Sequence, residues 1–384
     1  PRTAWEHIRG IEPYEISHPP LGKLIMGVGI RLFGMTPFGW RFMGTLFGVG
    51  MLPLLYVFLK NLFGRTSIAT CGTVLLAADF MHLTQTRLAT IDTYAFFFIL
   101  LMYYFMYRYL TLPAGAPFRK CALPLFLSGL FWGIGAASKW TVIYGCTGLV
   151  VLYFIGLYQK LRDWPADGET GARQPGRLKW AFQILAFSVL VFALIPAAIY
   201  TLSYLPYAWA EGDSSLTGLV GAMWENQRYM LSYHSGVTDT HPYSSRWYQW
   251  LFDIRPILYY MDNSVPGYTT RFAAFVNPVV CWGGLLAVLA CAAQAVRRRC
   301  AKALFIVIGY LAQLVPWFFI GRITFAYHYF PSVLFLILAL CYVFYSLSEQ
   351  EELIAWKPAM YAITAGAAAL YALFYPVLVG IQIP

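Results

Sequence analysis

The feature that most constrains this fold is a series of ten apolar runs, each close to the roughly 17 to 25 residues that a membrane-spanning helix needs. The run 66–82 is the weakest, because Asp79 lies near its end. Lys139 alone separates two of the runs, so we expect a tight turn there. The pattern predicts an all-α polytopic membrane protein with spans at 39–59, 66–82, 91–109, 122–138, 140–158, 180–204, 272–296, 303–320, 323–346 and 356–379.

Composition excludes the soluble classes of protein. Hydrophobic residues make up 59% of the chain and charged residues only 11%, against about 25% charged residues in a soluble domain. The net charge of +10 does not indicate a nucleic-acid partner, because the basic residues are scattered among apolar runs. The 7 cysteines form no CxxC pair and have no histidine at zinc-ligand spacing, so we expect no structural zinc.

The basic residues also orient the spans, since short cytoplasmic loops collect lysine and arginine. Most of those in short loops fall on the face opposite the N-terminal segment, so we place that segment outside the cytoplasm. All 6 histidines fall on the same outer face or within about one helical turn of it. We therefore predict extracytoplasmic chemistry in the cell membrane, and a division into outer loop 1–38, spans 39–204, outer loop 205–271 and spans 272–384.

Two further helices are predicted to lie in the membrane interface instead of crossing it. Residues 21–33 and 216–231 carry apolar side chains at helical spacing, and both lie in outer segments. Asp213, Ser214 or Ser215 would cap the second of these helices.

The first candidate for chemistry is the segment 18–23. Pro19 and Pro20 fix the backbone after His18 and permit a helix that starts at the second proline. The segment would then present His18 and Lys23 on a rigid loop at the membrane surface. The alternative is an ordinary helix start with an incidental histidine.

The second candidate is Arg87 with Asp92, at the outer start of a span. Ionisable groups at membrane depth are costly and are commonly kept for function or for pairing. Alternatively, Thr90 caps the helix and Asp92 lies in its first turn, where a carboxylate suits the helix dipole.

The third candidate is the outer loop that interleaves His234, His241, Arg246 and Arg255 with aromatic residues. Its arginines would hold a phosphate or pyrophosphate through charge-assisted hydrogen bonds. The alternative is an aromatic belt whose arginines reach lipid headgroups. Weaker candidates are Arg322 with Tyr327 and His328, Lys139 in the tight turn, and Arg41 after Trp40 at the mouth of the first span.

Several catalytic motifs are missing from the sequence. It contains no P-loop, no Rossmann glycine fingerprint and no His-Glu-x-x-His motif. Nucleotide hydrolysis, dinucleotide binding and zinc proteolysis therefore have no support. Basic, histidine and aromatic side chains at one face of a polytopic protein instead indicate a lipid-phosphate substrate approached from the outer leaflet.

Taken together, these motifs resemble bacterial protein O-mannosyltransferases of the GT-C class, nearly end to end. The resemblance implies a GT-C-type helix bundle with eleven spans, ten of them in this sequence. It also implies inverting transfer of mannose or another hexose from a polyprenyl phosphate to Ser or Thr of a protein. The matching segments are His-Pro-Pro-Leu-Gly-Lys at 18–23, Trp-Arg at 40–41, Arg87 to Asp92, Ala-Ser-Lys-Trp at 137–140, His-Pro-Tyr-Ser-Ser-Arg-Trp at 241–247 and Tyr-His-Tyr-Phe-Pro at 327–331.

The resemblance further implies roles for single residues. The donor phosphate is expected at Arg41, Lys139, Arg246 and Arg255. The family's catalytic Asp-Glu pair is expected to precede residue 1, and within the chain Glu15 or Asp92 would have to replace it as base. No cofactor is implied, although a divalent cation is compatible with the chemistry. Residues expected to shape the active site are His18, Pro19, Pro20, Lys23, Arg87, Asp92, His234, His241, Tyr327 and His328.

The expected partners are a polyprenyl-phosphate-sugar donor, a protein or peptide acceptor and the lipid bilayer. Two alternatives stay open: a GT-C transferase with a glycolipid or cell-wall acceptor, and a transporter or flippase of lipid-linked precursors. Residues that bind the donor say little about the acceptor. A transporter typically has inverted repeats and ionisable residues in mid-span, and the sequence shows neither.

Overall fold

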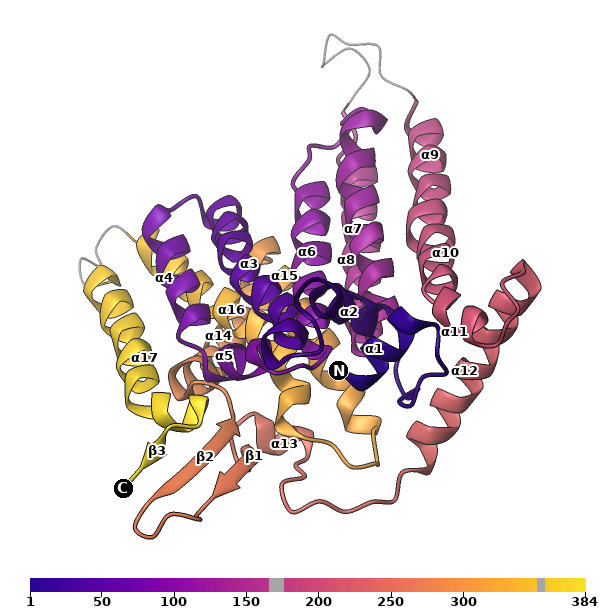
Figure 1. The fold of residues 1–384 in the computed structure, drawn as a ribbon. Coiled ribbons are helices and arrows are strands. Elements are labelled where there is room, and N and C mark those ends of the chain that lie inside the picture. The colour runs from indigo at the N-terminus through magenta and orange to yellow at the C-terminus, as the bar shows by residue number, and fades with distance from the viewer. Residues whose placement is uncertain (166–175, 351–355) are drawn as a thin grey trace.

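The computed structural model describes residues 1–165, 176–350 and 356–384. Long helices form a bundle, and the loops and short elements of residues 1–36 and 203–278 gather at one end of it, hereafter the polar end (Figure 1). Within the described ranges, 8 helices are long and apolar enough to cross a membrane, and the bent pair α4 and α5 would make 9. The predicted helical membrane bundle is confirmed.

The ten predicted spans all correspond to helices. Helix α6 (Asp92–Leu110) is not among the eight helices that are apolar enough to cross a membrane, and it carries Asp92, Arg108 and several tyrosines. The remaining elements of the bundle are α3 (Pro37–Phe63), α4 (Thr66–Ala77), α5 (Phe80–Arg87), α7 (Phe118–Ser138), α8 (Thr141–Arg162), α9 (Arg177–Val189), the π-helix η1 (Leu190–Leu194), α10 (Ile195–Leu202), η2 (Val279–Gly283), α14 (Gly284–Arg297), α15 (Ala301–Leu314), η3 (Val315–Phe319), η4 (Ala326–Tyr329), α16 (Phe330–Ser348) and α17 (Trp356–Val379).

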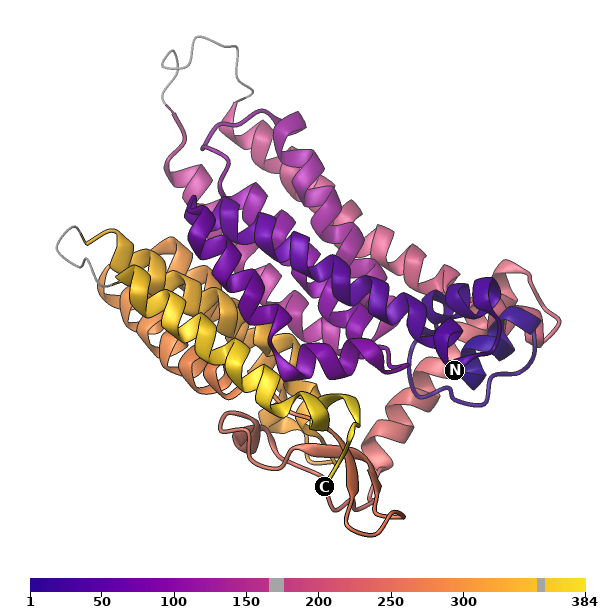
Figure 2. The same cartoon turned by 60° about the vertical axis from the view of Figure 1, so that its left-hand side comes forward.

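Helix α16 forms the centre of one half of the bundle. It is apolar around nearly its whole circumference, and such a helix is stable only when neighbours cover every side. Helices α4, α14, α15 and α17 pack around it, and α6 touches it from the other half. Figure 2 shows the two halves side by side, with α14 to α17 in one and α6 to α10 in the other.

The expected span 66–82 is wrong as a single helix. It breaks at Asp79 into α4 and α5, whose axes are bent by 56°. The side chain of Asp79 accepts a hydrogen bond from the His82 amide at 2.8 Å and so caps α5. It also accepts one from the Asn277 amide at 3.0 Å. A carboxylate that caps a new helix explains why the apolar run does not continue straight.

A small antiparallel sheet was not predicted. It consists of β1 (Ile257–Asp262), β2 (Thr269–Ala274) and β3 (Gln382–Ile383), with β2 in the middle. The expected span 272–296 therefore begins too early, since residues 272–274 belong to β2 and the helix starts at Val279. These strands lie outside the bundle, where turn residues interrupt the apolar pattern.

The predicted interfacial helices are present at the polar end (Figure 1). Helix α2 spans Leu21–Phe33 as expected. Helix α12 (Leu216–Gly236) runs longer than predicted, and Ser215 caps it by accepting a hydrogen bond from the Gly218 amide at 3.1 Å. The short helices α1 (Arg2–Arg9), α11 (Leu205–Ala210) and α13 (Trp247–Trp250) complete this end. The adjoining ends of α8 and α9 lie at the opposite end of the bundle.

Close packing of α7 against η1 gives a stability prediction. A Cβ on Gly129 would lie 2.1 Å from the Val191 carbonyl oxygen, so the two backbones would have to separate. We expect Gly129→Ala to lower the free energy of unfolding by about 1–3 kcal/mol, the usual cost of overpacking. Gly366→Ala on α17 is the matched control, because nothing lies within 4 Å of its Cβ. Thermal melts in detergent would compare them, and equal melting temperatures would contradict the prediction.

Candidate functional site

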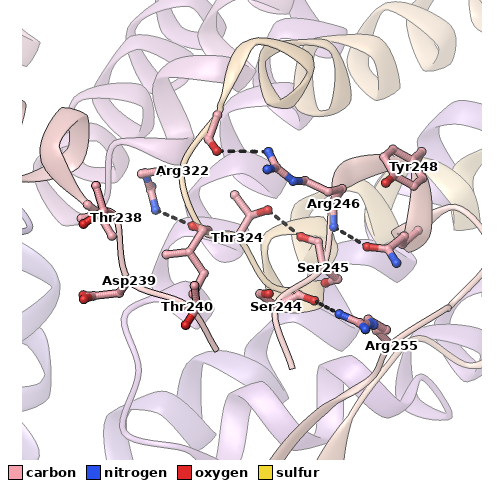
Figure 3. A pocket seen from close by; sticks show the side chains of 14 residues that line it. Thr238, Asp239, Thr240, Ser244, Ser245, Arg246, Tyr248, Arg255, Arg322 and Thr324 are labelled. Atoms are coloured by element: carbon pink, nitrogen blue, oxygen red, sulfur yellow. Dashed lines mark hydrogen bonds between the residues drawn. The ribbon is translucent and has the colours of Figure 1, made fainter. Parts of the chain in front are cut away.

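Three adjoining cavities follow one another across the polar end. The Asp92 cavity has a volume of about 420 Å³. The His234 cavity, of about 560 Å³, shares His18 and Lys139 with it. The arginine cavity, of about 710 Å³, shares Arg322 with the His234 cavity (Figure 3). Residues far apart in the sequence thus form one continuous polar surface.

Two lysine–carboxylate pairs line the Asp92 cavity. Lys139, in the turn between α7 and α8, places Nζ 2.5 Å from Oδ1 of Asp92, the first residue of α6. Only 6% of the Lys139 side chain and 12% of the Asp92 side chain are exposed. Because this pair is sheltered from water, removing one partner would leave the other charge uncompensated. Lys139 also lies 5.5 Å from the ring centre of Tyr327.

The second pair joins Lys23 to Glu15. Burial raises the pKa of Glu15, but the Lys23 ammonium and hydrogen bonds from Lys23 and Ser17 outweigh this and lower the pKa to about 2. A carboxylate with so low a pKa is a weak general base at neutral pH. Asp92 is likewise engaged by an ammonium group. Each of the two internal candidates for the base is therefore already paired with a lysine.

The His234 cavity gathers His18, His234 and His328 beside Lys139 and Arg322. The rings of His18 and His234 lie 5.6 Å apart, and Nε2 of His234 is 2.9 Å from the Ser17 carbonyl. Burial lowers the pKa of His18 to about 3, and burial also lowers the pKa of His234. These two imidazoles are neutral at pH 7, so Lys139 and Arg322 supply the positive charge of this cavity.

Asn226 connects α12 to the loop that carries His18. Only 4% of it is exposed, although it lies between the polar residues Glu225 and Gln227. Its side chain donates to the Ile16 carbonyl at 2.9 Å and accepts from the Tyr204 hydroxyl at 2.8 Å. By contrast, Leu216 and Leu231, two of the apolar side chains at helical spacing, are 75% and 66% exposed. Nothing in the sequence distinguished Asn226 from the other polar residues of this helix.

The structure separates the residues predicted to bind phosphate. Lys139 lines the first two cavities, whereas Arg246 and Arg255 line the arginine cavity. Arg41 is exposed on α3 and lines none of the three. Arg322, only a weak candidate in the sequence, lines two of them. Contact of Arg41 with phosphate stays a prediction.

The other predicted site residues lie partly inside and partly outside these cavities. Asp92 pairs with Lys139 and not with Arg87, whose buried Nη1 has no partner among the described residues. Helix α6 has no side-chain cap, so Thr90 does not play that role. His241 is exposed and packs edge-on against Phe325. Residues that line a cavity but received no predicted role include Tyr259 and Trp140.

The structure also shows where the two prolines of segment 18–23 lie, and it allows a search for metal-binding groups. Pro19 and Pro20 are buried, and Pro20 immediately precedes α2, so they set the path of the loop without lining a cavity described above. Within the part of the chain that the structure describes, no three His, Cys, Asp or Glu side chains form a group able to hold a metal ion.

The lowered histidine pKa values predict acid sensitivity. The folded state keeps His18 neutral, whereas the unfolded chain takes up a proton below its ordinary pKa of about 6.5. Stability should therefore fall as pH drops from 6.5, by up to about 1.4 kcal/mol per pH unit for each such histidine. Burial lowers the pKa of His7 in the same direction, to about 4.

Melting temperatures between pH 7.5 and pH 5 would test this. The carboxylate of Glu15 does not contribute to a decline in this pH range. Its stabilising effect is lost only at lower pH, between the ordinary pKa of 4.5 and the lowered pKa of about 2. His18→Gln should flatten the decline, and the exposed His241→Gln is the control. Parallel declines in wild type and His18→Gln would contradict the prediction.

Two families match the chain, and between them they cover most of it. The family described as dolichyl-phosphate-mannose-protein mannosyltransferase matches residues 2–210. The family described as the C-terminal four TMM region of protein-O-mannosyltransferase matches residues 219–384.

Curated relatives include polyprenol-phosphate-mannose–protein mannosyltransferases from two mycobacteria. The protein of Mycolicibacterium smegmatis strain MKD8 is 26% identical over 390 residues, which cover 88% of this chain and 74% of the relative. The protein of Mycobacterium tuberculosis strain CDC 1551 is 26% identical over 345 residues. That match covers 79% of this chain but 65% of the relative, slightly less than two thirds of its length.

Solved structures share the fold. The protein O-mannosyltransferase complex of S. cerevisiae bound to the sugar donor matches with a TM-score of 0.83 at 13% identity, over 99% of this chain and 85% of that one. ArnT from Cupriavidus metallidurans bound to undecaprenyl phosphate matches with a TM-score of 0.59 at 16% identity, over 98% of this chain and 59% of that one. At these identities the likeness concerns the fold alone.

Proposed function

We propose that this chain, which belongs to the dolichyl-phosphate-mannose-protein mannosyltransferase family, transfers mannose from a polyprenyl phosphate to Ser and Thr hydroxyls of proteins. It is a multi-pass membrane protein. Curated relatives are named for the same donor and for a protein acceptor.

The observation that carries this proposal is the position of Lys139. It lies buried at the junction of the Asp92 and His234 cavities, and Arg322 also lines the His234 cavity. We place the donor phosphate between these two cations. In the ground state the donor is a phosphodiester with a single negative charge, and a second charge develops on the phosphate as the bond to the sugar breaks. Fixed positive charge therefore stabilises the transition state more than the ground state.

Polyprenyl phosphate is a stable leaving group and needs no proton from an acid, whereas the acceptor hydroxyl must lose its proton to a general base. The expected Asp-Glu pair would take up that proton, because Glu15 and Asp92 are each engaged by a lysine. Neutral His18 can offer one N–H donor and one acceptor nitrogen to the sugar hydroxyls. His234 has only Nδ1 left, as an acceptor, because its Nε2 donates to the Ser17 carbonyl. Asp92 and Glu15 act as positioning residues, because each carboxylate is engaged by a lysine. Arg246 and Arg255 lie in the next cavity, so this proposal does not include their predicted contact with the donor phosphate. The titrations with polyprenyl phosphate described below test that contact.

Transfer itself can be measured directly. Protein purified in detergent together with the expected Asp-Glu segment would be incubated with polyprenyl-phosphate-mannose and a Ser/Thr-rich peptide, and the peptide would be examined by mass spectrometry. We expect addition of a hexose that depends on the lipid-linked donor and is not supported by a nucleotide sugar. Transfer to a glycolipid but never to peptide would instead support the alternative acceptor class.

We also propose that the polar end faces the extracytoplasmic side. The basic loops favour this orientation, and cysteine labelling in intact cells tests it. Ser264→Cys, exposed between β1 and β2, should react with an impermeant maleimide. Arg119→Cys, exposed at the start of α7, should react only after permeabilisation. None of the native cysteines is exposed, so the wild type serves as background control. The reverse labelling pattern would overturn the orientation.

A further inference from the structure

The arginine cavity carries positive charge that its own walls do not neutralise. Arg246, Arg255 and Arg322 approach it from three different segments (Figure 3). Within the described ranges, none of the three takes part in an ion pair. Asp239, an acidic residue of the lining, is exposed to solvent. The cavity is therefore suited to an anionic group.

Each guanidinium keeps most of its hydrogen-bonding capacity. Nη1 of Arg246 donates to the Gly321 carbonyl at 3.1 Å, and Nη1 of Arg255 donates to the Ser244 carbonyl at 3.3 Å. Arg322 donates to the carbonyl of its neighbour Ile323 at 3.1 Å. A guanidinium has five N–H donors in a planar fork. The unused donors of Arg246 and Arg255 can form the paired hydrogen bonds that a carboxylate accepts, whereas Arg322 is assigned above to the donor phosphate.

The backbone that carries these arginines is held rigidly. The Ser245 amide donates to the Thr324 carbonyl at 2.9 Å, and the Thr324 hydroxyl donates to the Ser245 carbonyl at 2.6 Å. Both residues are buried, and the Trp250 indole N–H donates to the Ser245 hydroxyl at 2.9 Å. Because the segments 244–246 and 322–324 are joined in this way, little ordering is needed when a ligand binds.

The lining can accommodate a polypeptide. It combines hydroxyl-bearing residues such as Thr238, Thr240 and Ser244 with Val237, Ile323 and the exposed ring of Tyr248. Hydroxyl and guanidinium groups form hydrogen bonds with the backbone and carboxylates of a polypeptide, whereas a prenyl chain has no hydrogen-bonding group. The cavity also shares Val237 with the His234 cavity, so its occupant would lie beside the reacting centre.

We propose that the arginine cavity is an acceptor subsite that binds an Asp or Glu side chain of the polypeptide, near the Ser or Thr that receives the sugar. The proposal rests on the function proposed above and names the acceptor class that this site prefers. A carboxylate seated between planar guanidinium groups would fix the register of the acceptor chain, so that a neighbouring hydroxyl reaches the donor.

Peptide binding tests the proposal without requiring turnover. Fluorescently labelled Ser/Thr peptides, each with a single glutamate moved along the sequence, would be titrated with the full chain in detergent. Matched peptides would carry glutamine instead. We expect at least one glutamate position to bind about tenfold or more tightly than glutamine. Arg246→Gln and Arg255→Gln should abolish that preference, whereas Arg271→Gln, exposed on β2 and outside the cavity, should retain it.

A second titration, with polyprenyl phosphate and no peptide, separates the two possible anions. The proposal expects both cavity variants to bind polyprenyl phosphate within about threefold of wild type, with unchanged melting temperatures. Equal affinity for glutamate and glutamine peptides at every position would overturn it. Loss of polyprenyl phosphate binding in these variants would also overturn it and return the cavity to the donor. Absence of sugar transfer with an intact glutamate preference would count against the proposed function alone.

Discussion

Replacing Lys139 with methionine is expected to lower the rate of sugar transfer by about 100- to 1000-fold, the usual effect of removing one group that stabilises developing negative charge. The lysine is buried at the junction of two cavities, so water cannot easily replace its charge. The rate constant should fall at saturating donor, because the charge on phosphate grows as the sugar leaves. Initial rates at several donor concentrations would separate the effect on the rate constant from the effect on donor affinity.

The partner of Lys139 supplies the control. The single substitution Lys139→Met leaves Asp92 buried without a counter-charge. This lowers the free energy of unfolding by about 3–5 kcal/mol unless the carboxyl group takes up a proton. Adding Asp92→Asn should restore the melting temperature but not the transfer rate. Asp92→Asn on its own keeps the ammonium group and should retain more activity than either Lys139 variant. Recovery of transfer in the double variant would show that Lys139 has only a structural role.

Removal of Arg322 should weaken donor binding more than removal of any other arginine at the polar end. It lines the His234 cavity together with Lys139, and among the described residues its side chain donates only to the carbonyl of its neighbour Ile323. A charge-assisted contact contributes about 1.5–3 kcal/mol, so Arg322→Ala should reduce donor affinity by about one to two orders of magnitude.

Matched variants sharpen this second expectation. Arg322→Lys should recover part of the affinity if a single charge suffices, and little of it if the contact is bidentate. Arg246→Ala removes a similar side chain from the neighbouring cavity and should stay within about threefold of wild type. If Arg246→Ala weakens donor binding as much as Arg322→Ala, the phosphate lies in the arginine cavity.

The helices could be predicted from the sequence because their cause is local. A long apolar run with few charges specifies a spanning helix regardless of its neighbours. The bounds of α2 were likewise predictable, since Pro20 precedes it and Gly34 follows it with a positive φ of 76°. Asp79 marked the weak point of its apolar run, but the sequence did not show that it caps a separate helix or that its second oxygen accepts a hydrogen bond from the distant Asn277.

The candidate site was also predictable only where the cause is local. Residue types and motifs singled out His18, Lys139, His234 and Tyr327, which line one or both of two adjoining cavities. Their partners were not predictable from spacing. Asp92 seemed to belong with nearby Arg87, yet it pairs with a lysine 47 residues away. Only the packing of α6 against α7 brings these charges together.

The central claim is that the donor phosphate lies beside Lys139 and Arg322, and an experimental structure with bound polyprenyl phosphate tests it most directly. The account predicts density for the phosphate in the His234 cavity, within hydrogen-bonding distance of Nζ of Lys139, with the prenyl chain leaving toward the membrane. Phosphate bound instead at Arg41 on α3, or between Arg246 and Arg255, with the Lys139–Asp92 pair undisturbed, would contradict it.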